Sequence, residues 1–202
     1  MADCYVNAPA SEKKQSFFEP FAGALRICDI IFAKAKESRE SDTMTVNSRA
    51  MKNITYQTEK ERLEEAAKEL NMASNITEYI YNSRQLPPNE SQLIKNFYYS
   101  IYHLVKAISV LDTGIEYESH SSLISYFNRE IKHEDFLKKF DVDISDIRDV
   151  GNELNTLFVF RDNYDYRDAA VDEEDYKEAE EIWQNLYPKL ENIVILILNS
   201  MK

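Results

Sequence analysis

Residues 89 to 111 read NESQLIKNFYYSIYHLVKAISVL, and this stretch decides the fold. Apolar side chains recur along it at helical spacing and leave little polar surface, which predicts a helix buried inside the protein. Asn89 can cap the first turn, and the Gln92 side chain can return a bond to it. Gly114 can adopt the left-handed conformation that ends helices. The principal apolar stripe consists of Leu93, Phe97, Leu104, Ile108 and Leu111.

Two further helices are predicted on either side of this central one. Residues 58–84 carry a helical pattern with Thr58 and Glu61 as a capping pair, and this helix should run antiparallel to the central helix. Residues 119–131 predict a third helix, which Ser119 can cap. The small residues that would let the first two axes approach closely are Ala66, Ala67 and Ala73.

Two more helices complete the pattern. A fourth is expected from caps within residues 141–145 to about Arg161, and a fifth begins at Asp172. Because Pro188 lies inside the fifth helix, a kink or short break is expected near residues 184–187. The class is therefore all-α, an up-and-down bundle of about five helices.

The N-terminal part differs from the rest. Residues 1–57 are expected to form a helical arm and linker, and residues 58–202 the bundle, with irregular structure over residues 37–58. The arm's apolar face should pack either on its own bundle or against a second copy of the chain. The predicted arm helix has about six turns, and its apolar face consists of Phe17, Phe18, Phe21, Leu25, Cys28, Phe32 and Ala35.

Charge is unevenly distributed along the chain. The formal net charge of −12 divides into +1 over residues 1–57 and −13 over residues 58–202. An acidic surface repels phosphate backbones, so general nucleic-acid binding through a basic face is disfavoured, while a local basic cleft remains open. Solubility is the simplest interpretation of this acidity.

The sequence also bears on compartment, redox state and metals. The longest apolar run, 193–198, is too short to span a bilayer and the N-terminus lacks a leader pattern, so a soluble cytoplasmic protein without membrane contact is expected. Cys4 and Cys28 lie outside any metal or redox spacing and should be reduced thiols. No metal or other cofactor is expected, because no metal-ligand spacing joins His103, His120 and His133.

Three local sequences occur in a characteristic order: NFYYSIYH at 96–103, SHSSLISYFNR at 119–129 and FRDNYDYRD at 160–168. Their notable features, in chain order, are a Tyr-Tyr pair, a His before the third helix, a Phe-Asn-Arg at the end of that helix, and an Arg followed by Asp-Tyr. In this order, over about residues 58–202, they resemble the HEPN domain family (higher eukaryotes and prokaryotes nucleotide-binding).

The resemblance implies a helical bundle that commonly forms a homodimer and is often encoded beside a small nucleotidyltransferase partner in toxin-antitoxin pairs. Many members resemble metal-independent RNases, in which an Arg is followed four to six residues later by a His at a cleft between protomers. In this chain those positions after Arg161 are Asp165, Tyr166 and Arg167. The chain therefore resembles the branch with Arg and then Asp-Tyr.

Candidate catalytic residues follow from the chemistry of RNA cleavage, which needs a base for the 2′-hydroxyl and a cation for the phosphate. Arg161 can supply the cation. Asp165, Tyr166 and His120 are the candidate bases, although the first two need shifted pKa values for that role. The candidate ligand-binding residues on the central helix are Tyr99, His103 and Lys106.

Structural roles compete with these functional ones. Arg161 and Asp165 are four residues apart and could form an ion pair at a helix end, with Tyr166 packed over the bundle. His120 could serve as a cap at the start of the third helix, and His103 as a hydrogen-bonded core residue.

Three functional hypotheses result. The favoured one is a non-catalytic HEPN-type interaction or nucleotide-binding module, the regulatory member of a toxin-antitoxin or defence-type system that acts with a nucleotidyltransferase partner. The second is a metal-independent RNase toxin that cleaves RNA with Arg161 at a dimer cleft. The third is a structural adaptor whose aromatic arm docks on a partner helix.

Overall fold

The computed structural model describes residues 53–83, 89–128, 134–143, 145, 147–166 and 170–201. The predicted arm helix over residues 17–35 and the positions Ile131 and His133 lie outside these ranges. In the described residues the chain forms six helices and two very short strands, so the predicted all-α bundle is confirmed.

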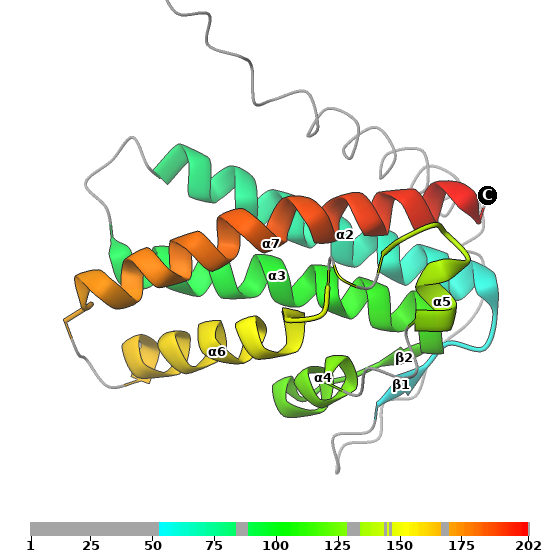
Figure 1. Cartoon of the computed structure of the whole chain (residues 1–202), viewed down its shortest axis with the longest axis horizontal. Helices are drawn as coiled ribbons and strands as arrows, with labels where there is room; N and C mark the ends of the chain where they lie inside the picture. The colour runs from blue at the N-terminus through cyan, green and yellow to red at the C-terminus, as the bar shows by residue number, and fades with distance from the viewer. Residues whose placement is uncertain are drawn as a thin grey trace, which may run out of the picture.

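Four long helices make up the body of the bundle: α2 (Glu59–Ser83), α3 (Glu90–Thr113), α6 (Val150–Tyr166) and α7 (Glu173–Ser200). They lie side by side, and successive helices run in opposite directions (Figure 1). Two short helices, α4 (His120–Phe127) and α5 (Glu134–Lys138), and a two-stranded ribbon lie toward one end. The ribbon pairs β1 (Ile54–Thr55) antiparallel with β2 (Ile115–Glu116).

Helix α3 is the centre of the bundle, as predicted, because α2, α6 and α7 all pack against it. Its predicted cap is confirmed: the Asn89 side chain accepts a hydrogen bond of 3.1 Å from the backbone N–H of Gln92. The Gln92 side chain donates to Asn96 rather than back to the cap. Gly114 ends the helix with a φ of 71°, the left-handed conformation expected there.

Helix α2 also begins and packs as predicted. The Thr58 hydroxyl accepts from the backbone of Glu61, and the Glu61 carboxylate accepts from the backbone of Thr58, which is a reciprocal capping box. The small side chains of Ala66, Ala67 and Ala73 are fully buried in the core, which allows the close packing of α2 on α3.

Of the kink or short break predicted in the last helix, the break does not occur and the kink stays a prediction. Helix α7 runs without interruption from Glu173 to Ser200, with Pro188 inside it. Proline removes the bond to the carbonyl of Gln184, and both residues lie on the exposed side of the helix. Water can therefore satisfy that carbonyl, so the helix tolerates the proline where a buried position would not.

Other boundaries differ from the prediction. Helix α6 begins at Val150 and continues to Tyr166, so Arg161 lies inside a helix rather than at its end. Helix α5 lies between the predicted third and fourth helices, where the sequence predicted no element, and β1 lies within a segment expected to be irregular. Ser119 caps α4 as predicted. No helix in the described ranges is long and apolar enough to cross a membrane.

Candidate functional site

Two adjoining groups of polar and aromatic side chains meet on α3. The first, called here the aromatic-arginine cluster, contains Tyr98, Tyr99, Tyr102, His120, Phe158 and Arg161. The second, called the lysine-carboxylate network, contains Tyr56, Glu65, Lys68, Glu69, His103, Lys106 and Glu116.

Arg161 joins helix α6 to the aromatic side chains of α3. Its Nη2 donates a hydrogen bond of 2.9 Å to the Tyr99 hydroxyl, and its guanidinium carbon lies 5.4 Å from the centre of the Tyr99 ring. The residue is 9% exposed. A guanidinium over an aromatic face gains cation-π attraction, which is stronger where water is excluded. Arg161 is thus both a packing element and a fixed positive charge.

His120 is the first residue of α4 and enters the same cluster. Its Nδ1 forms a short hydrogen bond with the Tyr98 hydroxyl, and its ring stacks on Phe158 with the centroids 5.2 Å apart. Burial, and secondly the positive charge of Arg161, lower the pKa of His120 below its usual range. The imidazole is therefore neutral at pH 7.

The buried tyrosines remain protonated. Burial raises the pKa of Tyr98, and the neighbouring Tyr102 and Tyr99 raise it further against the opposing charge of Arg161. The pKa of Tyr102 is also raised, chiefly by burial. Neither phenol can act as a base near neutral pH, so Tyr98 and Tyr102 supply ring surface and hydroxyl groups.

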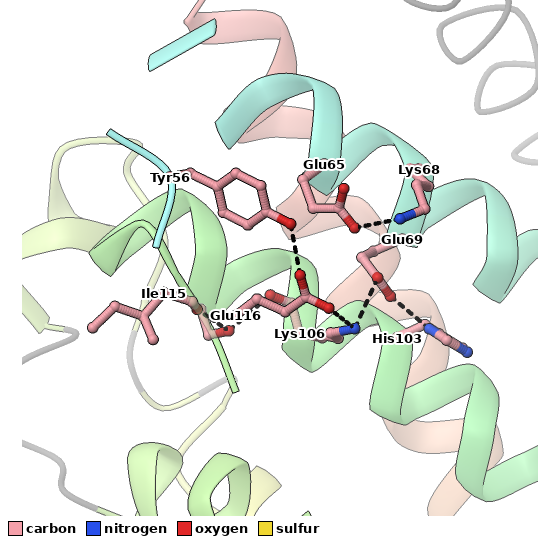
Figure 2. Close-up of polar contacts among 9 residues, drawn as sticks. Tyr56, Glu65, Lys68, Glu69, His103, Lys106, Ile115 and Glu116 are labelled. Atoms are coloured by element: carbon pink, nitrogen blue, oxygen red, sulfur yellow. Dashed lines mark hydrogen bonds and ion pairs between the residues drawn. The ribbon is translucent and has the colours of Figure 1, made fainter. Parts of the chain in front are cut away.

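Lys106 lies at the centre of the lysine-carboxylate network (Figure 2). Its Nζ lies 3.1 Å from Glu69 Oε1 and 2.5 Å from Glu116 Oε1, and its side chain is 13% exposed. Burial opposes the charge on Lys106, but the bond to Glu116 and both carboxylates outweigh it and raise its pKa. The ammonium is therefore fully charged and bound to groups of its own chain.

Glu69 connects the lysine to a histidine. Its Oε2 lies 2.5 Å from His103 Nδ1, and the carboxylate is almost completely buried. Burial alone would raise the pKa of Glu69, but the hydrogen bond from His103 and the charges of His103 and Lys106 together lower it. On the opposite side of the network, the Tyr56 hydroxyl donates to Glu116 Oε2 at 2.6 Å.

The two groups touch through His103. Its ring centre lies 5.5 Å from that of Tyr102 and 6.5 Å from that of Tyr99. A chain of contacts therefore runs from Tyr56, beside the first strand, to Arg161 on α6. These contacts connect the two groups along α3, from α2 and the ribbon on one side to α4 and α6 on the other.

Among the described residues, a cation could be held by Glu65, Glu69 and Glu116, each of which offers a carboxylate oxygen within 4.8 Å of the others. The ammonium of Lys106 already binds two of these carboxylates, and Lys68 lies 2.8 Å from Glu65. This set of contacts fits an internal charge network better than a metal-binding site.

The predicted site residues divide into three groups. Arg161, Tyr99, His120 and His103 come together in one layer, whereas Lys106 belongs to the network and is bound to carboxylates. The backbone of residues 165–166 lies on α6 past Arg161, and their side chains lie outside what the structure describes. The predicted roles of Asp165 and Tyr166 remain predictions.

The sequence reasoning missed several members of the site. Tyr98 and Tyr102 are four residues apart on the central helix, so their shared face could have been recognised. Glu69 lies between Ala67 and Leu70 at a position that the apolar pattern assigns to the core, and a charge there signals a buried partner. Phe158 and Glu116 carried no comparable signal.

The fold and the site define a helical bundle whose central helix presents tyrosines and histidines to an arginine of the next long helix. The HEPN domain model matches residues 91–193, which is more than half of the chain. The chain therefore belongs to the HEPN domain family. The matched region contains α3 through most of α7 and leaves out α2, which supplies Glu69. No curated protein and no solved structure gives a significant match.

Proposed function

We propose that this protein is a non-catalytic HEPN-type module that binds a nucleotide or RNA end and regulates a partner protein. The observation that carries the proposal is the state of Lys106, whose ammonium lies between two carboxylates of its own chain. A cation so occupied is not available to a phosphate, because a ligand would have to displace two charge-assisted bonds.

Recognition is assigned to the aromatic-arginine cluster. Tyr99 and His120 are half-buried rings, and each lies in the same layer as Arg161. Aromatic rings stack on unpaired bases and a guanidinium binds a phosphate, which is how proteins commonly hold single-stranded nucleotides. Because the Lys106 ammonium is bound to two carboxylates, we assign phosphate binding to Arg161.

The wider setting of the proposal comes from the HEPN family. We propose a regulatory role in a toxin-antitoxin or defence-type system, as a homodimer acting with a nucleotidyltransferase-type partner. The strong acidity of residues 58–202 supports specific protein or small-ligand contacts over general nucleic-acid binding. Light scattering of the purified chain would test the dimer, and co-purification with a co-expressed small nucleotidyltransferase would test that class of partner.

One observation favours a second candidate, a metal-independent RNase. His120 is neutral near pH 7 and feels the charge of Arg161, so a base and a cation lie near each other. In that reaction His120 would take the proton of a 2′-hydroxyl while Arg161 stabilises the charge on the attacked phosphate. The 2′-oxygen would bond to phosphorus and the bond from phosphorus to the 5′-oxygen would break. The leaving oxygen would take a proton from water, and the proton held by His120 would neutralise the resulting hydroxide.

The deciding experiment is incubation of the full-length protein with labelled cellular RNA, without metal, beside Arg161→Ala. The exposed Arg148 lies in the turn before α6, so Arg148→Ala is a matched loss of one positive charge. The proposal expects intact RNA in all three samples, with nucleotide or RNA binding weakened by Arg161→Ala and unchanged by Arg148→Ala. Cleavage lost in Arg161→Ala but retained in Arg148→Ala would establish the RNase instead.

A further inference from the structure

The outer face of α2 changes character halfway along the helix. Eight of the eleven residues from Glu59 to Glu69 are charged, whereas Glu78 is the one charged residue from Leu70 to Ser83. In this second half most exposed or half-buried positions on the outer side are apolar or amide, with the exposed Glu78 and the half-buried Ser83 beside them. We call this surface the α2 patch, made of Met72, Asn75, Ile76, Tyr79 and Asn82.

The α2 patch has the composition of a contact surface. Tyr79 is 53% exposed and Met72 39%, and they are two of the five large apolar side chains exposed in the described ranges. Together with Ile76 they recur at intervals of four and three, which places them on one helical stripe. Interface cores are depleted of charge and enriched in Tyr and Met. Because 30% of the residues in this chain are charged, a helix face that only met solvent would be expected to carry more charged side chains.

We propose that the α2 patch is covered by the N-terminal arm of the same chain. The arm's predicted helix over residues 17–35 has an apolar face with four phenylalanines, which needs a surface to cover it. Residues 37–52 connect it to the first described residue, Asn53, and sixteen extended residues span roughly 50 Å. The centre of the patch, Asn75, lies about 24 Å along α2 from Glu59, well within that reach.

The linker is long enough to allow either direction of the arm. The proposal takes the antiparallel one, in which the C-terminal end of the arm helix is placed nearer the charged half of α2. Lys34, Lys36 and Arg39 then lie near the first turns of α2, where Glu61 and Glu64 are acidic. The phenylalanines at the opposite end of the arm lie over the α2 patch. The basic residues and the phenylalanines of the arm therefore favour the same antiparallel arrangement.

The arm carries a natural probe, because Cys28 lies on its apolar face and Cys4 is the one other cysteine of the chain. Full-length protein with Cys4→Ser and Asn75→Cys would be treated with a short bis-maleimide and mapped by mass spectrometry. We expect efficient linking of Cys28 to position 75 within one chain. Adding Tyr79→Lys should lower that yield several-fold.

The control is Lys60→Cys in the same Cys4→Ser background. Lys60 is well exposed on the same helix and lies nearer to the point where the arm joins. Tethering without docking would therefore link position 60 at least as efficiently as position 75, and that result would overturn the proposal. Linking between two chains, seen as a dimer on a denaturing gel, would also overturn it, since a second copy would then occupy the patch.

Discussion

Lys106→Met offers the sharpest test of the lysine-carboxylate network. Methionine keeps most of the apolar length of lysine and removes the ammonium that lies 3.1 Å from Glu69 and 2.5 Å from Glu116. Both carboxylates are largely buried, with side chains 2% and 12% exposed. Removing one partner of a buried ion pair leaves an uncompensated charge and costs about 3 to 5 kcal/mol. For a chain of this size the melting temperature should fall by roughly 10 °C.

The assay is thermal unfolding followed by circular dichroism at pH 7, with Lys68→Met as the matched control. Lys68 pairs with Glu65 at 2.8 Å but its side chain is 54% exposed, so its loss should change the unfolding free energy by less than about 1 kcal/mol. Adding Glu116→Gln to Lys106→Met should restore part of the lost stability, because one of the two unpaired charges is then removed.

The pH dependence gives an independent check. Without the ammonium, the pKa of Glu69 should rise, because burial raises it and the hydrogen bond and charge of Lys106 that lower it are lost. The stability lost in Lys106→Met is then largest near pH 7 and shrinks as pH falls through the raised pKa, so Lys106→Met should approach the wild type in mild acid. If Lys106→Met matched the wild type at pH 7, Lys106 would be free for a ligand and the non-catalytic proposal would lose its main support.

Three further predictions concern single residues. Burial raises the pKa of Glu191, whose carboxylate accepts a 2.8 Å bond from the Tyr187 hydroxyl. The stability that Glu191 contributes is present below its pKa in the unfolded chain and is lost as pH rises through its pKa in the folded protein. Glu191→Gln should therefore raise the unfolding free energy by about 1 kcal/mol at pH 7 and lose that advantage in acid, as denaturation at the two pH values would show. The pKa of His120, followed by NMR, should lie below its usual range and rise in Arg161→Ala while staying below it, because burial is the larger cause; an unchanged value would contradict the proximity of the two groups. Gly114→Ala should cost about 1 to 3 kcal/mol in urea unfolding, because φ is 71° and a Cβ there would lie 2.7 Å from the carbonyl oxygen of Tyr56; an unaffected midpoint would refute this.

Local signals gave the body of the fold correctly. Caps such as Asn89 and Thr58 act within one turn, so the residues that form them are adjacent in sequence. Two-residue strands are too short to show a period, which is why the ribbon was missed. Spacing could not decide between a kink and a break at Pro188, because the cost of proline depends on which side of α7 faces solvent, and that depends on packing; the break does not occur.

The candidate site was predictable only in part. Residues on α3 share one helix, so Tyr99, His103 and Lys106 could be grouped from their spacing. Whether Lys106 faces a ligand or a carboxylate depends on how α2 is aligned along α3, because its partner Glu69 lies 37 residues earlier. Sequence spacing carries no information on that alignment.

The ribbon has a consequence for the order in which the site assembles. The pairing of β1 with β2 brings together two residues that are 60 apart in sequence. Tyr56 precedes α2, and Glu116 follows α3. Every contact of the lysine-carboxylate network is therefore available once the chain has been synthesised to β2. Arg161 arrives later, on α6, and completes the aromatic-arginine cluster. A ligand that binds Arg161 together with Tyr99 would thus stabilise the docking of α6 on a hairpin that is already closed.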